Sequence, residues 1–161
     1  MNTVLRSILS ATLCSAFAVA QAQATGSVEV QWLKPETYTD AGRSSTDRER
    51  VMQTLGAHLQ KLGQQLPPGQ VLKLAITDLD LAGEIDLFRW HDLRVLRGRA
   101  DWPRMSLRYA LSADGRPLKS GEAQLQDMSY LFSPLLSMRQ EDLAFEKRML
   151  NQWFKAEFGA R

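Results

Sequence analysis

The chain has 161 residues, of which 44% are hydrophobic and 24% are charged, and its formal net charge is +2. This length allows one domain, or one domain with a short tail. The composition is typical of a globular protein and excludes collagen, a coiled coil, a disordered chain and a multispanning membrane protein. So small a net charge points to no class of partner.

The first two dozen residues have the pattern of a secretory signal peptide. Arg6 precedes an apolar run from Ile8 to Ala20, and small residues then alternate with glutamine up to Ala24. The run is shorter than the about 20 residues that a membrane-spanning helix needs, and an A-x-A arrangement is typical of signal cleavage. A buried N-terminal helix is the alternative, but no charged residue interrupts the run to give it an amphipathic stripe.

We predict cleavage after Ala22 or Ala24, so that residues 1–24 form the signal peptide and residues 25–161 form a single periplasmic domain without a membrane span. The one cysteine, Cys14, follows Leu13 and lacks the small preceding residue of a lipoprotein signal, so no lipid anchor is expected. The mature chain then has no cysteine, and it forms neither a disulfide nor a thiolate metal site.

The first part of the mature chain predicts a strand and then a helix. Val28, Val30 and Trp32 alternate with polar residues, which indicates a strand with these three side chains facing inward. Thr46-Asp47-Arg48-Glu49 has the spacing of a capping box, so we expect a helix to start there and to end at Pro67-Pro68-Gly69. Its apolar stripe consists of Val51, Met52, Leu55, Leu59, Leu62 and Leu66.

The run from Val71 to Leu81 predicts a strand whose phase changes at Thr77. Apolar residues occupy even positions up to Ile76 and odd positions from Leu79. A regular strand would bury the carboxylate of Asp78 on the apolar face, which is too costly for an unpaired charge. We therefore predict a β-bulge near Thr77 that returns the acidic side chains to the solvent side.

The rest of the chain predicts three strands and a C-terminal helix. The strands are expected around Leu93–Leu96, at Met105–Leu111 and at Leu118–Leu125, with a hairpin turn at Ala113–Pro117, an irregular segment at Asp127–Met138 and a helix at about Gln140–Phe158 capped by Gly159. Short turns between successive strands favour an antiparallel sheet, and amphipathic helices need a sheet face to cover them. The predicted fold is an α+β two-layer sandwich with a mainly antiparallel sheet of about five strands and two amphipathic helices.

Six segments of the mature chain resemble one protein family. They are Val28-Glu29-Val30-Gln31-Trp32, Pro35-Glu36-Thr37-Tyr38-Thr39-Asp40, Leu66-Pro67-Pro68-Gly69-Gln70, Thr77-Asp78-Leu79-Asp80-Leu81-Ala82-Gly83, Trp102-Pro103-Arg104 and Glu146-Lys147-Arg148-Met149-Leu150-Asn151-Gln152-Trp153-Phe154. Together they resemble the domain-of-unknown-function family numbered 3016, small exported proteins of Gram-negative bacteria. The resemblance implies periplasmic residence and supplies no reaction, ligand or catalytic residue.

The densest acidic run consists of Asp78, Asp80, Glu84 and Asp86, and it suggests two kinds of chemistry. Calcium takes several oxygen ligands from one short loop, but in an EF-hand alignment Arg89 stands where a bidentate glutamate belongs, so no metal is expected. Asp78 and Asp80 could instead serve as the acid and base of a hydrolase, since side chains two apart on a strand lie about 7 Å apart. The simpler interpretation is that these acids pair with nearby arginines.

The two histidines give little support to catalysis. His58 falls at the edge of the apolar stripe of the first helix and is expected to be a packed boundary residue. His91 precedes Asp92, but adjacent side chains usually point apart. The chain has neither a G-x-S-x-G nor an H-E-x-x-H motif, so no common hydrolase template applies and no cofactor is expected.

Residues 89–108 contain six arginines against two aspartates, next to Trp90 and Trp102. Planar guanidinium groups bind phosphates and carboxylates through paired hydrogen bonds, so Arg94, Arg97, Arg104 and Arg108 are candidate anion-binding residues. The alternative is that they form the solvated face of a sheet, because Arg94 and Arg108 alternate with apolar neighbours.

The sequence therefore predicts a non-catalytic periplasmic binding or accessory domain of the cell envelope, contacting its partner through the arginine-rich sheet face and the loops at its ends. The expected partner is an anionic envelope component or another protein, and not nucleic acid. A hydrolase that uses the Asp78/Asp80 region and a calcium-binding domain are the two alternatives.

Overall fold

The computed structural model describes residues 25–85, 94–98, 100–132 and 141–159. The predicted signal peptide lies outside these residues. Four strands form the main sheet: β1 (Ser27–Trp32), β2 (Gln70–Asp80), β5 (Arg104–Ala113) and β6 (Arg116–Gln126). A second sheet pairs the short strands β3 (Glu84–Ile85) and β4 (Arg94–Val95). The α+β prediction is confirmed, with six strands in two sheets in place of about five.

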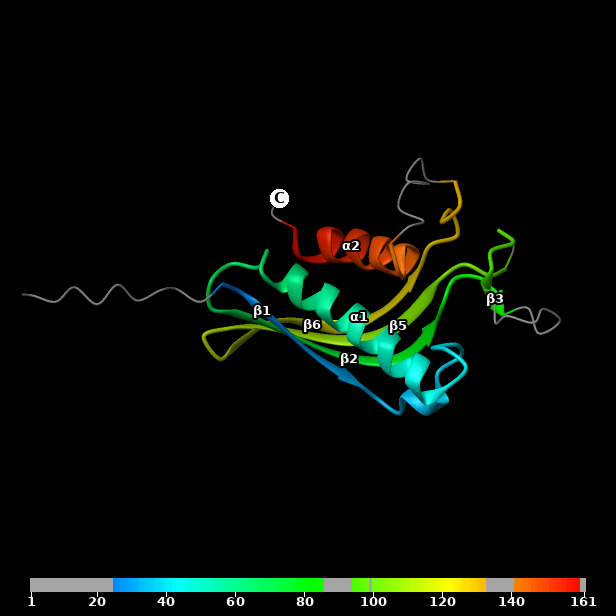
Figure 1. The fold of residues 1–161 in the computed structure, drawn as a ribbon. Helices are drawn as coiled ribbons and strands as arrows, with labels where there is room; N and C mark the ends of the chain where they lie inside the picture. Colours follow the sequence, from blue (N-terminus) through cyan, green and yellow to red (C-terminus); the bar gives the residue numbers. More distant parts are fainter. Residues whose placement is uncertain (1–24, 86–93, 99, 133–140, 160–161) are drawn as a thin grey trace, which may run out of the picture.

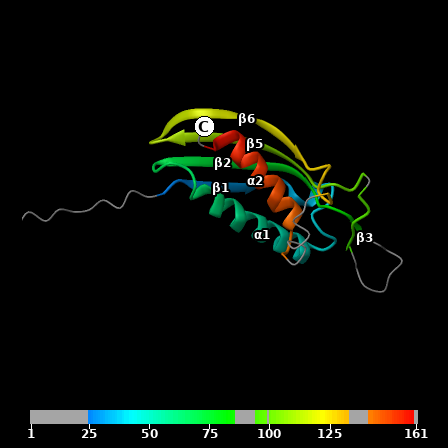
Figure 2. The same ribbon diagram turned by 90° about the horizontal axis from the view of Figure 1, so that it is seen from above.

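The main sheet has the order β1-β2-β5-β6. β1 runs parallel to β2, because helix α1 (Ser45–Gly63) crosses back between them, and the other two pairs are antiparallel. Helix α2 (Ala144–Phe158) follows the last strand, and Figures 1 and 2 show both helices side by side over the same face of the sheet. The fold therefore has the two layers that the amphipathic patterns predict.

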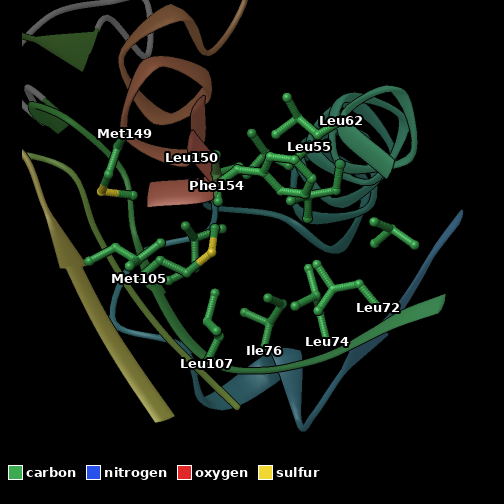
Figure 3. Packing of buried hydrophobic residues seen from close by; sticks show 14 of the residues in the cluster. Leu55, Leu62, Leu72, Leu74, Ile76, Met105, Leu107, Met149, Leu150 and Phe154 are labelled. Carbon is green, nitrogen blue, oxygen red and sulfur yellow. The ribbon is translucent and has the colours of Figure 1, made fainter. Parts of the chain in front are cut away.

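The core lies between this sheet face and the two helices (Figure 3). β2 contributes Leu72, Leu74 and Ile76 before the bulge and Leu79 after it, all with at most 2% of their surface exposed. From α2, Met149, Leu150 and Phe154 point into this core, and the Phe154 ring extends toward Leu55 of α1 (Figure 3). The other sheet face is polar, with the ion pairs Lys73–Glu29 and Arg108–Glu122.

The predicted β-bulge is confirmed. Ile76 lies opposite Leu107 of β5, whereas Asp78 lies opposite Ser106, so Thr77 is the extra residue. The Thr77 hydroxyl donates to the carbonyl oxygen of Ser106 at 3.1 Å. The bulge therefore keeps Leu79 in the core and places Asp78 outside it.

Two helix starts differ from the predictions. α1 is capped by Ser44, whose hydroxyl accepts from the Asp47 N–H at 3.0 Å, and the predicted cap, Thr46, lies inside the helix. The S/T-x-x-D/E spacing occurs twice here, and the first occurrence forms the cap. α2 begins at Ala144 because Leu143 has a left-handed backbone (φ 55), so Glu141 and Asp142 precede the helix and do not lie in its first turn.

The remaining expectations are met in part. The strand predicted at Leu93–Leu96 is the two-residue β4, and Leu93 itself lies outside the described residues. Residues 127–132 form irregular turns as expected, while the rest of the predicted irregular segment is not described. Among the described residues, no helix is long and apolar enough to cross a membrane.

Candidate functional site

A pocket of about 820 Å³ lies where the N-terminal ends of both helices meet the end of β2 and the β3–β4 sheet. Its lining mixes apolar side chains with ionic ones: Gly42, Arg43, Asp47, Arg50, Val51, Leu81, Ala82, Ile85, Arg94, Val95, Leu96, Glu141, Asp142, Leu143, Ala144, Phe145 and Glu146. This volume is within the range of about 300–1,000 Å³ that is usual for ligand sites.

Arg94 of β4 fixes one wall of the pocket. Its Nη2 forms a 2.8 Å ion pair with Oδ2 of Asp40, and its Nη1 donates to the carbonyl oxygen of Gly83 at 2.8 Å. The Ala82 carbonyl oxygen lies 3.3 Å from the same nitrogen. Arg94 thus holds the turn after β2 against the loop before α1, and its charge is already matched by Asp40.

Glu146 of α2 reaches the same turn from the opposite side. Its carboxylate accepts the Ala82 N–H at 2.8 Å, and only 2% of the residue is exposed. Burial raises the pKa of Glu146, while the Ala82 bond and the Arg94 charge act in the other direction. A buried carboxyl with a raised pKa lies between the helix and the sheet at the pocket.

Sequence reasoning missed Glu146, although a signal for it exists. Glu146 precedes Met149 and Leu150 by three and four residues, and Trp153 and Phe154 by seven and eight. That spacing places it on the buried stripe of the helix. A carboxylate on an apolar stripe predicts a specific partner in the core, here the backbone of Ala82.

Asp78 and Asp80 both have partners within the chain. Asp78 accepts from the backbone N–H of Thr39 at 2.8 Å and from its hydroxyl at 2.9 Å. Asp80 forms a 3.4 Å ion pair with Arg104, in keeping with the interpretation that these acids pair with nearby arginines. Burial raises the pKa of Asp80, and the charge of Arg104 opposes that shift.

Of the other acidic and histidine candidates, the structure describes Glu84 and His58, which lie on different elements. Glu84 is exposed on β3, whereas Asp86, His91 and Asp92 lie outside the described residues. His58 joins the two helices, with its Nε2 2.8 Å from Oδ1 of Asn151, and burial lowers its pKa. Within the described ranges, no cluster of three or more His, Cys, Asp or Glu side chains could hold a metal ion.

The four candidate arginines do not share one face. Arg94 lies at the pocket and pairs with Asp40. Arg104 pairs with Asp80, whose pKa the nearby charge of Asp40 also raises. Arg108 lies on the polar sheet face, where its Nε donates to Glu122 at 2.9 Å. Arg97 is exposed in the loop after β4. Three of the four therefore form ion pairs of their own, and anion binding by the set stays a prediction.

A second buried polar cluster lies next to the pocket. Arg148 of α2 forms an ion pair with Asp127, whose residue is 5% exposed, and Arg148 Nε donates to it at 2.9 Å. The Tyr130 hydroxyl accepts the Gly98 N–H at 3.2 Å and bonds to Asp101. Asp101 and Asp127 lie in irregular segments without periodicity, so no sequence pattern indicated their burial.

A model of a family described as "Protein of unknown function (DUF3016)" matches residues 26–156. The chain belongs to this family. No curated protein and no solved structure matches the chain. The match confirms the resemblance found in the sequence and covers every element of the fold except the last two residues of α2.

Four of the six segments that carry the DUF3016 resemblance meet at this end of the molecule, whereas Leu66–Gln70 lies at the start of β2, at the other end of the sheet. Asp40 pairs with Asp80 in an isolated parallel bridge, and the Gly83 N–H donates to the Asp101 carbonyl oxygen at 2.8 Å. Arg104 lies over the Trp102 ring at 4.9 Å, and Glu146 completes the contact from α2. These segments thus form the wall of the pocket and its support.

Proposed function

We propose that this chain is an exported periplasmic domain of the cell envelope that binds a protein partner and performs no catalysis of its own. The signal pattern of residues 1–24 supports export. The observation that carries the binding proposal is the pocket at the helix N-termini, which is large enough for a peptide segment and presents both apolar and ionic groups.

The charges of the pocket favour a polypeptide over a simple anion. Arg50 pairs with Asp47 at 3.6 Å, Arg94 with Asp40, and Glu141 with Lys147 at 2.6 Å. The raised pKa of Glu146 favours its neutral form. A simple anion would therefore meet arginines that are already paired, whereas a peptide segment can contact groups of both signs together with the apolar surface.

The carboxylates that suggested hydrolysis serve the fold. Asp78 accepts hydrogen bonds from both donors of Thr39, and Asp80 forms an ion pair with Arg104. Neither residue lines the pocket. These contacts support a structural role for the pair.

Site-specific photo-crosslinking in intact cells tests the binding proposal. A benzoylphenylalanine in place of Arg50, whose side chain is 70% exposed at the pocket, should give a discrete adduct with one envelope protein. The matched control replaces Lys73, which is similarly exposed on the polar sheet face. The adduct should weaken when Asp142→Arg reverses a charge of the pocket lining.

No adduct at either position, or equal adducts at both, would contradict the proposal. An adduct from Lys73 alone would move the binding surface to the polar face of the sheet, where Arg108 lies.

One observation favours hydrolysis as a second candidate. Burial raises the pKa of Asp80, which is the direction of shift that the general acid of a glycosidase needs. If this pair is catalytic, Asp80→Asn should abolish cleavage of peptidoglycan by the purified mature protein, and the wild type must show such cleavage. A wild type without activity on that substrate leaves Asp80 with its structural role alone.

A further inference from the structure

Two loops at the pocket end of the molecule form one continuous surface. They comprise residues 96–98 and 100–104, which join β4 to β5, and residues 127–132, which follow β6. The Asp127 N–H donates to the Pro103 carbonyl oxygen at 3.2 Å, and the Gly98 N–H donates to the Tyr130 hydroxyl. We call this the two-loop surface.

The two-loop surface exposes large apolar side chains. Phe132 is 84% exposed and Met128 is 61% exposed, and Leu118 is the only other large hydrophobic side chain among the described residues that is similarly exposed. Leu131 and Trp102 are partly exposed nearby. Isolated exposed hydrophobics are common, but two on one turn of six residues require an explanation.

The turn that carries Met128 and Phe132 is firmly attached to the fold. Asp127 is buried in its ion pair with Arg148 and also accepts from the backbone and hydroxyl of Ser129 at 3.2 and 3.1 Å. Tyr130 is 2% exposed and packs edge-on against Phe145 with ring centres 5.0 Å apart. The apolar side chains are therefore held outward by a rigid base.

The exposed charge of the two-loop surface is positive. Both carboxylates of its described residues, Asp101 and Asp127, are buried. Arg97 is exposed. The Arg104 side chain is 43% exposed and lies over the Trp102 ring, and it pairs with Asp80 at 3.4 Å. Apolar tips beside arginines match a bilayer interface, where side chains enter the headgroup region and cations attract anionic lipids.

We infer that the two-loop surface docks this protein reversibly onto an anionic lipid bilayer. Phe132 and Met128 enter the interface, and Arg97 contacts lipid phosphates. A protein surface could also receive apolar tips, but the coincidence of the exposed Arg97 with the buried carboxylates of Asp101 and Asp127 favours phosphate-bearing lipid. This docking is independent of the pocket proposal, because Met128, Phe132 and Arg97 do not line the pocket, although Leu96 at the edge of the surface does.

Vesicle flotation with the purified mature protein tests the inference. Vesicles of phosphatidylethanolamine with phosphatidylglycerol should carry the wild type, and vesicles of phosphatidylcholine alone should carry much less. The double variant Met128→Ser/Phe132→Ser should lose flotation, and Arg97→Ser should reduce it several-fold. Added salt should weaken binding of the wild type, as expected of phosphate contacts.

Matched controls separate docking from general stickiness and from unfolding. Leu118→Ser removes an apolar side chain of similar exposure from β6, and Arg116→Ser removes an exposed arginine from the same strand. Both should float as the wild type does, and all variants should melt at about its temperature. Equal flotation of every variant, or no flotation of the wild type with anionic vesicles, would overturn the inference.

A wild type that fails to float but crosslinks to a protein through position 132 would assign the surface to a protein partner and likewise overturn it. The Arg50 crosslink of the pocket is expected to persist in Met128→Ser/Phe132→Ser, so the two proposals fail separately.

Discussion

The backbone N–H of Ala82 donates to Oε1 of Glu146 across 64 positions of the chain, at 2.8 Å. This one bond joins the segment after β2 to the first turn of α2. From the other side of that segment, Arg94 donates to the carbonyl oxygens of Ala82 and Gly83. Ala82 is therefore held through both its N–H and its C=O. These two contacts fix the position of Ala82 in the pocket wall.

Glu146 should make stability depend on pH. Burial raises its pKa above the ordinary 4.5. At pH values between 4.5 and the folded-state pKa, the folded protein therefore keeps a proton that the unfolded chain has released. The stabilising contribution is full below pH 4.5 and is lost as the pH rises through the folded-state pKa. Glu146→Gln keeps an acceptor for Ala82 and should remove this dependence. Urea denaturation of both proteins across that pH range measures it.

Glu146→Ala is the control for the hydrogen bond itself. It leaves the buried Ala82 N–H without an acceptor, which should cost about 1–3 kcal/mol below pH 4.5 and less as the pH rises through the folded-state pKa of Glu146. A Gln variant with the same pH dependence as the wild type would assign the dependence to another group.

Asp78 should prove structural. Asp78→Ala removes the acceptor for both donors of Thr39, and we expect a loss of about 1–3 kcal/mol in the free energy of unfolding. Thr39→Val deletes only the hydroxyl donor and should cost less. Added Ca²⁺ should not raise the melting temperature of the wild type. A calcium-dependent rise that is lost in Asp78→Ala would restore the calcium-binding alternative, since a ligand of the native state must stabilise it.

The sequence predicts those parts of the fold that local patterns encode. The change of phase between Ile76 and Leu79 locates the bulge within one residue, because a strand has period two and a buried unpaired carboxylate is excluded. The same logic predicts that Asp80 pairs with a nearby arginine, and the structure identifies that arginine as Arg104.

The pocket could not be predicted because its contacts are long-range. Arg94 pairs with Asp40 and Glu146 bonds to Ala82, and neither pairing has a local sequence pattern. The predicted start of α2 was wrong for a related reason. Leu143 adopts a left-handed backbone that nothing in its neighbours requires, so the helical stripe alone placed the start too early.

Export predicts a defined N-terminus for the mature protein. Protein purified from the periplasm should begin at Gln23 or Thr25, because the small residues before them suit the signal peptidase. N-terminal sequencing, or the intact mass, measures this directly. A protein that retains Met1 after envelope fractionation would contradict both export and the periplasmic proposal.

The ion pair of Asp127 and Arg148 predicts an asymmetric response to mutation. Arg148→Met leaves a buried carboxylate without its partner, which should cost about 3–5 kcal/mol. The double variant Asp127→Asn/Arg148→Met removes both charges and should recover much of that loss. Chemical denaturation of the two variants measures the difference. Equal losses in both would show that the pair contributes through packing alone.

Gly56 and Gly63 of α1 should respond in opposite directions to the same substitution. A Cβ on Gly56 would meet no atom within 4 Å, so Gly56→Ala should stabilise the helix by up to about 1 kcal/mol through its better helix propensity. A Cβ on Gly63 would lie 2.7 Å from the backbone nitrogen of Val28. Because that nitrogen belongs to β1 and cannot move aside like a flexible side chain, Gly63→Ala should force α1 away from the sheet and destabilise the protein by about 1–3 kcal/mol. Thermal melting of the two variants compares the same change at two sites of one helix, and a Gly63→Ala protein as stable as the wild type would show that α1 does not contact β1 this closely.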